Sequence, residues 1–527
     1  MEFKNVKIGD FDGLRGIEAK YRMEGREVLV TVPSEAVLEV TNAGQRDTPF
    51  ADFVAQQVWE NNLWDGRLAF KLLYEAKVQG ETSNKKAWMA SLPRKFSTPL
   101  HWTGSAVAET QYPALRASVV AQKKLWRSLY NTWQSHKLAA AAVVSYDDFV
   151  WAMENVNSRA FSGIYEGSTS TERRNLLLFT GLLTILWPLV GFGTYEQSLN
   201  AAVAVGVSIV LRDIFLSKSA NLKRYVVCPM IDMFNHKSTS TAEVSFNYFS
   251  GKFEVMSGET EKYEAGDQVF ITYGKQGNDR LLQYYGFVEQ DNVYDSYDFG
   301  DTFLGVFIKY GDKVNAAVPL PADASDAIKR LQTLTSALQN SGTLEGSQAG
   351  SGKERSGMKS AISAIDTNVR YYRNTRTFDD VSTRCLRALY ASAQEWQLVT
   401  DSRGMLALDA LHAPLSAQTE KAVRRAQGQL AQLELESKAS RLEDDEAQLR
   451  VMVSGRSKDK SGGVVGSFSV GFGGESPSKV VERAKSSVRT ASTVDPSGRF
   501  KDTLYTAVAF RIEKKKLLLE ASRLGLS

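Results

Sequence analysis

Two polar motifs bracket a run of predicted strands in residues 228–288, and this segment constrains the fold more than any other part of the chain. The first motif, CPMIDMFNHK, begins at Cys228, and the second, ITYGKQGNDRLLQYYGFV, begins at Ile271. Between them, EVSFNYFSGKFEVM alternates apolar and polar residues and breaks at Ser250-Gly251, and AGDQVFITYG adds a second turn and strand. Alternation with a period of two, interrupted by turns that contain glycine, predicts a β-meander.

The segments before this meander change from a strand pattern to a helix pattern. Residues 13–40 contain two close glycines, a turn, and an alternating strand from 28 to 32 that Pro33 ends. Residues 50–165 place apolar residues three and four positions apart, as in FVWAMENVNSRAF. We therefore predict a β-domain that is split by a helical insertion.

Strand patterns fade after about residue 300, and helical spacing dominates the rest of the chain. We predict an all-helical domain over 300–527, with a polar loop at Gly342–Gly357 and a mobile Gly/Ser-rich insertion at 454–478. The basic triplet Lys514–Lys516 is predicted to be a solvated helix face. Helical spacing is found in Ala322–Asn340, Ser382–Leu398, Ala417–Ser437 and Phe500–Leu524.

Composition excludes several classes of protein. A net charge of +4 with interspersed signs is too weak a bias for nucleic acid as the main partner. Cys228 and Cys385 are the only cysteines and lie far apart, which suits a reducing compartment. With four histidines and no C-x-x-C pair, we expect no metal site. The start, MEFKNVKIGDF, has neither a secretory nor a transit pattern, so the protein stays where it is made or a leader precedes this sequence.

Residues 175–211 form two uncharged stretches separated by Glu196. The first stretch, 175–195, meets the length of ~20 residues needed to span a bilayer, whereas the second, 197–211, falls short. Either the pair is a membrane hairpin, or it docks on the protein and covers apolar surface of the helical insertion. Pro188, the glycines and the short second arm favour docking or shallow interfacial contact. Basic residues flank the pair at Arg173, Arg174, Arg212, Lys218, Lys223 and Arg224.

Seven segments together resemble one branch of the SET-domain methyltransferases, which includes the Rubisco large-subunit lysine methyltransferase and the actin histidine methyltransferase. They occur in family order. The uncharged hairpin separates two elements that lie closer together in relatives, and the leader of chloroplast relatives is missing. The segments are GLRGIEA, KAWMASLPRKFSTPLHW, FVWAMENVNSRAF, the two motifs CPMIDMFNH and ITYG with LLQYYGFV, SRLEDDEAQL, and TLYTAVAFRIEKKKLL.

The resemblance implies an α+β fold with four parts. The SET-type β-fold would comprise residues 1–48 and 225–299, split by the helical insertion of residues 49–224, which includes the hairpin 175–211. Residues 300–527 would form the all-helical domain that resembles the substrate-binding domain of the branch.

The resemblance also implies a cofactor, S-adenosyl-L-methionine, and residues that hold it. Close backbone approach would occur at Leu14, Arg15 and Gly16, where a small residue permits it. Arg159 would bind the methionine carboxylate through its forked guanidinium. Asp232 would pin the turn beside the cofactor. Asn235 and His236 would bind the amino group and adenine.

A second set of residues would form the reaction channel. Tyr273 would be the catalytic residue and would also touch the cofactor, aiming its hydroxyl at the transferring methyl group. Phe287 would form a cofactor wall and Tyr285 a channel wall, with Tyr284 as the competing neighbour.

The function that the resemblance implies is protein N-methylation. A lysine of a non-histone protein is favoured because relatives that act on lysine tend to have a tyrosine before the last Gly-Phe, where Tyr285 stands here. A histidine methyltransferase and a non-catalytic SET scaffold that binds a partner are the alternatives. We expect a protein substrate, a monomer, and a location in the cytoplasm or chloroplast stroma, with membrane contact through residues 175–211 as an open alternative.

Overall fold

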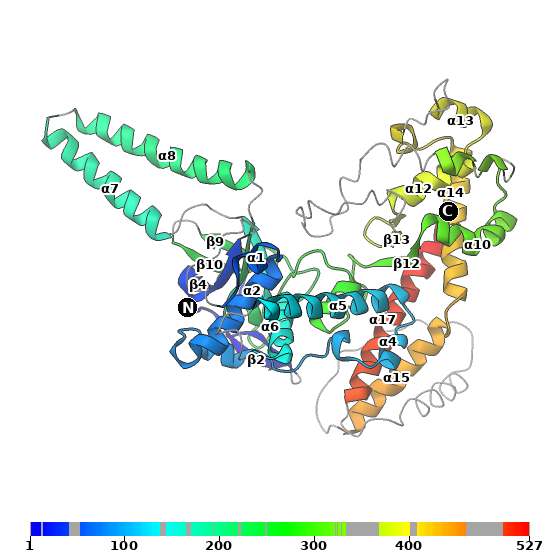
Figure 1. The fold of residues 1–527 in the computed structure, drawn as a ribbon, viewed down its shortest axis with the longest axis horizontal. Helices are drawn as coiled ribbons and strands as arrows, with labels where there is room; N and C mark the ends of the chain where they lie inside the picture. The colour runs from blue at the N-terminus through cyan, green and yellow to red at the C-terminus, as the bar shows by residue number, and fades with distance from the viewer. Residues whose placement is uncertain are drawn as a thin grey trace. The chain divides into compact units, whose positions relative to one another are not determined.

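A computed structural model describes most of the chain: residues 2–11, 14–41, 53–136, 144–164, 170–191, 193–219, 223–247, 250–321, 323, 325–327, 329–333, 368–400, 408–459 and 499–525. The chain divides into two compact units (Figure 1). The first consists of residues 1–96 and 123–275, and the second of residues 97–122 and 276–527. The predicted loop Gly342–Gly357 and most of the insertion 454–478 lie outside the described residues.

Three small sheets and a set of helices form the first unit. The strands are β1 (Glu2–Phe3), β2 (Val6–Phe11), β3 (Leu14–Ala19), β4 (Val28–Pro33), β5 (Leu38–Thr41), β6 (Phe161–Ile164), β7 (Lys223–Val227), β8 (Asn235–His236), β9 (Glu243–Asn247), β10 (Lys252–Met256) and β11 (Gln268–Ile271). Their orders are β1-β4-β10-β9, β2-β3-β11-β8 and β5-β7-β6. The strand predicted at 28–32 is confirmed as β4, and its residues Leu29, Val30 and Val32 are buried in the core of this unit.

The predicted β-meander is only half present. Strands β9 and β10 form the expected antiparallel pair, and Gly251 takes a φ of +65° in the turn between them, which glycine adopts without steric cost. Strand β11, however, does not pair with β10. It pairs antiparallel with β3 and parallel with β8. The prediction failed because period-two alternation identifies a strand but not its partner.

The helical insertion is confirmed. Helix α6 (Tyr146–Arg159) begins with a capping box between Ser145 and Asp148, and its apolar residues at three- and four-residue spacing are buried. The spacing therefore placed the helix correctly as far as Arg159, whereas Phe161, the last residue of the predicted helical pattern, begins strand β6 instead. The other helices of this part are α1 (Gln56–Glu60), α2 (Trp64–Tyr74), α3 (Lys86–Ser91) and α5 (Pro113–Ser135), the last of which contributes residues to both units.

Residues 170–219 form two helices, α7 (Ser170–Leu189) and α8 (Tyr195–Ser219), that lie side by side (Figure 1). Among the described residues, no helix has the length and apolar character required to cross a bilayer. The prediction that this hairpin docks and covers apolar surface is wrong for its described side chains, because Leu178, Leu182, Trp187 and other large apolar residues are exposed.

The second unit is mainly helical, but it is not all-helical as predicted. It contains a three-stranded antiparallel sheet of β12 (Ser296–Thr302), β13 (Asn368–Tyr372) and β14 (Thr377–Phe378). Strand β14 has two residues, too few for alternation to be recognised, whereas the five residues of β13 do alternate in burial and the prediction missed them. The helices are α4 (Gly104–Ala108), α10 (Phe303–Ala317), α12 (Asp380–Tyr390), α13 (Ala393–Val399), α14 (Ala417–Glu436), α15 (Leu442–Asp459) and α17 (Arg499–Ser522).

The basic triplet of helix α17 is not a solvated face. Lys514 and Lys515 are only 2% exposed, whereas Lys516 is half-buried. Lys514 Nζ lies 2.8 Å from the Asp295 carboxylate, and Lys515 Nζ lies 2.5 Å from that of Asp445. Buried charges are tolerated when they are paired and hydrogen-bonded, so these contacts explain why two lysines lie inside the second unit.

A second polar cluster predicts how this unit responds to acid. The Glu395 carboxylate accepts hydrogen bonds from the backbone N–H groups of Ser392 and Ser416 and from the Thr419 hydroxyl, at 2.7–2.8 Å. Burial alone would raise the pKa of Glu395, but these hydrogen bonds lower it to about 2.

We therefore expect Glu395→Gln to destabilise the second unit above pH ~4.3, the ordinary pKa of glutamate. A lowered folded-state pKa gives stability that is lost as the pH falls toward that pKa, so the difference from wild type should vanish near pH 2. Urea unfolding at several pH values measures this, with the exposed Glu443→Gln as the control. A difference that stays constant with pH would contradict the assignment.

Candidate functional site

The first unit brings together the segment of Leu14, Arg15 and Gly16, called the glycine segment, and the Asn-His motif of Asn235 and His236. Asn235 Nδ2 donates to the backbone carbonyl of Arg15 at 3.1 Å, across 220 positions of sequence. A Cβ atom on Gly16 would lie 2.9 Å from Asn235 Nδ2 and 2.5 Å from Gln268 Nε2, so only glycine fits without displacement of these amides. In this structure, the close packing of the Asn235 and Gln268 side chains is what leaves room for only a small residue at position 16.

His236 and Tyr273 are held against each other by the end of strand β11. The pairing of β8 with β11 is parallel, with Asn235 opposite Phe270 and His236 opposite Ile271. The backbone N–H of Tyr273 donates to His236 Nδ1 at 3.0 Å, and the two rings stack with centroids 5.0 Å apart. Because Nδ1 accepts this bond, the proton of a neutral His236 ring lies on Nε2.

The hydroxyl of Tyr273 is also fixed. It donates to the backbone carbonyl of Phe234 at 2.7 Å, in the turn that precedes strand β8. Phe234 itself is buried in the core of this unit. The phenol oxygen is thus anchored through its proton.

Arg159 and Asp232 form a second polar pair. Arg159 Nη1 donates to the Asp232 carbonyl at 2.7 Å and lies 3.2 Å from its carboxylate. Trp88 Nε1 donates to the same carboxylate at 3.1 Å. Burial raises the pKa of Asp232, and Arg159 and Trp88 oppose that rise. The prediction that Asp232 has a structural part agrees with these contacts.

The remaining residues of the glycine segment differ in placement. Arg15 Nη1 donates to the Ser91 carbonyl at 2.9 Å, and burial followed by the charge of Arg159 lowers the pKa of Arg15. Leu14 is 57% exposed, and the structure does not bring its side chain to the other predicted residues. Gly13 lies outside the described residues.

Three buried polar atoms of this region make no hydrogen bond in the part of the chain that the structure describes. They are the donors Arg159 Nε and Gln268 Nε2 and the acceptor Asp232 Oδ1. S-Adenosylmethionine offers a carboxylate, an ammonium group and an adenine ring, which need such donors and acceptors. The donor set and the tight position at Gly16 therefore fit the predicted cofactor, whose chemical groups would satisfy atoms that are otherwise costly to bury.

Trp88, Gln268 and the Phe234 carbonyl are site components that the sequence did not identify. Trp88 lies in KAWMASLP, a segment that was recognised as part of the insertion without a role at the site. Gln268 is the first residue of β11 and pairs with Glu18. No pattern marks either residue, because their roles depend on tertiary register.

The three aromatic residues predicted for the channel lie in the second unit. The Tyr285 and Phe287 rings contact edge to face, with centroids 6.2 Å apart. Tyr284 instead has the guanidinium of Arg280 over its ring at 5.5 Å. Burial raises the pKa of Tyr285. The two neighbouring tyrosines therefore have different surroundings, and Tyr285 is the one that shares an aromatic cluster with Phe287.

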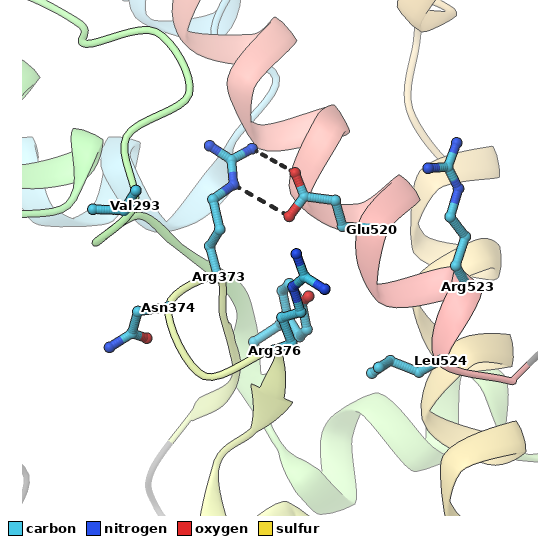
Figure 2. Close-up of a pocket in the computed structure, with 8 residues that line it drawn as sticks. Val293, Arg373, Asn374, Arg376, Glu520, Arg523 and Leu524 are labelled. Atoms are coloured by element: carbon cyan, nitrogen blue, oxygen red, sulfur yellow. Dashed lines mark hydrogen bonds and ion pairs between the residues drawn. The ribbon is translucent and has the colours of Figure 1, made fainter. Parts of the chain in front are cut away.

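Two of the pockets formed by the described residues lack the residues predicted to bind the cofactor, although one of them includes Gln268 of the candidate site. A pocket of 660 Å³ in the second unit is lined by Arg373, Arg376 and Arg523 among others, with Glu520 pairing Arg373 (Figure 2). A pocket of 420 Å³ in the first unit includes Gln268 in its lining. None of the predicted cofactor residues lines either pocket, and no group of metal-ligating side chains occurs among the described residues.

The sequence is similar to curated ribosomal lysine methyltransferases from two yeasts. It is 23% identical over 218 residues to ribosomal lysine N-methyltransferase 1 of Saccharomyces cerevisiae, covering 40% of this chain and 33% of that protein. It is 22% identical over 302 residues to ribosomal lysine N-methyltransferase 4 of the same yeast, covering 55% and 52%. The chain thus spans between about a third and about half the length of these relatives. No protein-family model matches the sequence.

Solved structures of a SET-domain protein share the fold over nearly the whole chain. The SET domain of LSMT bound to lysine and AdoHcy has a TM-score of 0.55 at 15% identity, covering 99% of this chain and 86% of that one. Rubisco LSMT bound to sinefungin and monomethyllysine has a TM-score of 0.54 at 16% identity, covering 99% and 87%. The predicted α+β SET fold is therefore confirmed.

Proposed function

We propose that this chain, which has the SET fold of Rubisco LSMT, is an S-adenosylmethionine-dependent protein-lysine N-methyltransferase. The observation that carries the proposal is the joined constellation of Asn235, His236 and Tyr273 beside Gly16. These residues come from the two signature motifs and the glycine segment, and hydrogen bonds or close packing hold them together. The relatives named as ribosomal lysine methyltransferases and the lysine-bound and AdoMet-bound structures of LSMT support the same activity.

In the proposed mechanism the protein aligns the reactants and excludes water. The cofactor, when bound, supplies a methyl group on a positively charged sulfur. The Gly16 backbone and Asn235 would hold its adenosyl and amino groups, and Arg159 Nε would pair with its carboxylate. Tyr273, fixed by the Phe234 carbonyl, would orient the attacking amine and stabilise the charge that changes during transfer.

The choice of lysine over histidine depends on the aromatic residues of the second motif. Tyr285 precedes Gly286 and Phe287, and a tyrosine at this place favours lysine. A lysine amine must be neutral to attack, and a dry aromatic channel beside a cation lowers its pKa. The roles of Tyr285, Tyr284 and Phe287 as channel walls, and of Leu14 and Arg15 as cofactor contacts, remain part of this proposal.

Replacement of Arg159 or of Asn235 by alanine should weaken cofactor binding. Arg159→Ala or Asn235→Ala leaves a buried polar group of the cofactor without its partner, which costs ~1–3 kcal/mol, or about tenfold to a hundredfold in Kd. Calorimetric titration with S-adenosylmethionine measures this. Arg22→Ala is the matched control, because its side chain is 67% exposed and pairs only at the surface.

Two results would contradict the proposal in different ways. If the wild-type protein shows no binding at micromolar cofactor, the alternative of a non-catalytic SET scaffold is favoured. If both variants keep wild-type affinity and thermal stability, the chain binds cofactor elsewhere. A labelled-methyl assay on cell extract, followed by mass spectrometry, then identifies the substrate and separates lysine from histidine products.

The proposal extends to the compartment and the oligomeric state. Cys228 and Cys385 are both buried thiols in the structure, which suits a reducing compartment such as the cytoplasm or chloroplast stroma. We expect a monomer that acts on a protein substrate and not on nucleic acid. Light scattering tests the monomer, and cell fractionation tests the compartment.

A further inference from the structure

The hairpin of α7 and α8 has small side chains inside and large apolar side chains outside. The side on which each helix faces the other can be identified, because among the described side chains the less exposed residues recur every four positions on each helix. Four-residue spacing places such residues on one side of a helix. They are Thr180, Thr184 and Pro188 on α7, and Ser198, Ala202 and Gly206 on α8.

The outer surface has the opposite character. On α8, Leu199, Val203, Val207 and Leu211 are each more than half exposed and also recur every four positions. On α7, consecutive residues from Leu182 to Trp187, except Thr184, are exposed apolar side chains, so they cover several sides of the helix. A helix in a water-soluble protein buries its apolar side. Small residues between helices with large apolar residues outside are typical of helices packed in lipid.

Charge is distributed along the hairpin as a lipid surface would require. Residues 175–195 and 197–211 contain no charged side chain. Apart from Glu196 between them, the charged residues of the hairpin lie where α7 begins and toward the end of α8. These two ends are held at one place, because β6 pairs with β7 and Ile164 lies opposite Lys223. The ends contain four basic and two acidic residues: Arg173, Arg174, Arg212 and Lys218 against Glu172 and Asp213.

We infer that this hairpin inserts into one leaflet of an anionic membrane, at the boundary between headgroups and acyl chains. The uncharged part of each helix, from Asn175 to Leu189 and from Gln197 to Leu211, is about 22 Å long at 1.5 Å per residue. That is shorter than the ~30 Å hydrocarbon core. Glu196 begins α8 at the far end of the hairpin, and a carboxylate there belongs at headgroup depth.

Lipid fits this surface better than a protein partner or a second copy of the chain. A protein interface covers one face of a helix pair, and the exposed apolar residues of α7 lie on several sides. The basic ends add attraction to anionic headgroups, worth most at low ionic strength. The inference rests on the hairpin alone and does not depend on methyl transfer.

Vesicle flotation of the full-length protein tests the inference. The protein should float with vesicles of phosphatidylcholine containing phosphatidylserine, and less with phosphatidylcholine alone or at high salt. The double variant Leu182→Asp/Leu186→Asp should weaken vesicle binding by about tenfold or more, because carboxylates are costly among acyl chains. Both side chains already face outward, so the fold should persist. Leu125→Asp/Leu398→Asp, at exposed apolar positions elsewhere, is the matched control.

A spectroscopic measurement gives a second readout at one residue. Trp187 is 50% exposed on α7, so its emission should shift to the blue when anionic vesicles are added. The shift should be lost in Trp187→Phe. Absence of both flotation and the shift would overturn the inference. The inference would also be overturned if the wild-type protein bound no vesicles and formed a dimer, seen by light scattering, that dissociated in the Leu182→Asp/Leu186→Asp variant. Resistance to carbonate extraction would overturn the one-leaflet depth.

Discussion

Replacement of Tyr273 by phenylalanine should slow methyl transfer by about 10²–10³-fold, which corresponds to ~3–4 kcal/mol of lost transition-state stabilisation. The Tyr273 hydroxyl is held by the Phe234 carbonyl, and its ring stacks on His236, so the oxygen is pre-positioned before substrate arrives. Phenylalanine keeps the ring and the backbone bond to His236 but removes this oxygen. Steady-state turnover with the identified substrate measures the effect.

The same substitution should leave cofactor affinity nearly unchanged, since the hydroxyl acts on the transferring group. Tyr263→Phe is the matched control. It removes a tyrosine hydroxyl from the same unit, one that donates a hydrogen bond to Glu261. Turnover of Tyr273→Phe close to wild type would remove Tyr273 from the mechanism. A thermal denaturation curve for each variant separates lost chemistry from lost folding.

Replacement of Lys514 by methionine should lower the free energy of unfolding of the second unit by ~3–5 kcal/mol. Lys514 is 2% exposed, and its ammonium contacts the carboxylates of Asp279 and Asp295 and the Ser296 carbonyl. Burial acts to lower the pKa of Lys514, but the two carboxylates outweigh it and raise that pKa above its ordinary value. Methionine would leave the fully buried Asp295 without a compensating charge.

Hydrogen exchange of the α17 amides reports this loss locally, which matters in a chain with two units. Lys309→Met is the matched control. Lys309 also pairs with a buried carboxylate, that of Glu434, but its own side chain is 57% exposed, so the change should stay within ~1 kcal/mol. Addition of Asp295→Asn to Lys514→Met should recover part of the stability. Equal protection in the Lys514 and Lys309 variants would show that the buried pair contributes nothing.

The central residues of the candidate site could be predicted because each lies inside an uninterrupted motif. Asn235, His236 and Tyr273 are identified from the two motifs, and only Tyr273 follows a strand, β11, that period-two alternation marks, since β8 has two residues. The structure joins His236 and Tyr273 by a hydrogen bond across 37 positions. Their proposed roles remain predictions, since geometry alone does not test them.

The partners of these residues could not be predicted. Trp88 and Gln268 reach the site through tertiary packing, and the hydroxyl of Tyr273 bonds a backbone carbonyl, which no side-chain pattern encodes. The β-meander failed for a related reason: alternation shows which face of β11 is buried but not that β3 and β8 are its neighbours.

For the lysine triplet Lys514–Lys516, the sequence predicted the helix correctly but predicted the exposure of the side chains wrongly. Helical spacing over 500–524 is confirmed by α17. The burial of Lys514 and Lys515, however, depends on carboxylates supplied by Asp279, Asp295 and Asp445 from distant segments. A lysine-rich run is ordinarily solvated, and only the folded arrangement of acidic partners reverses that expectation.

The pairing of Ile164 with Lys223 limits the entropic cost that the long insertion adds to the first unit. Closing a loop costs conformational entropy that rises only with the logarithm of its length, so the 73 positions between Arg159 and Asp232 weigh little more than a short loop would. Because β6 and β7 already form a ladder where the insertion leaves and returns, evolution could exchange the hairpin for a tight turn without moving Arg159 away from Asp232. The hairpin and the contact between Arg159 and Asp232 can therefore change independently of each other.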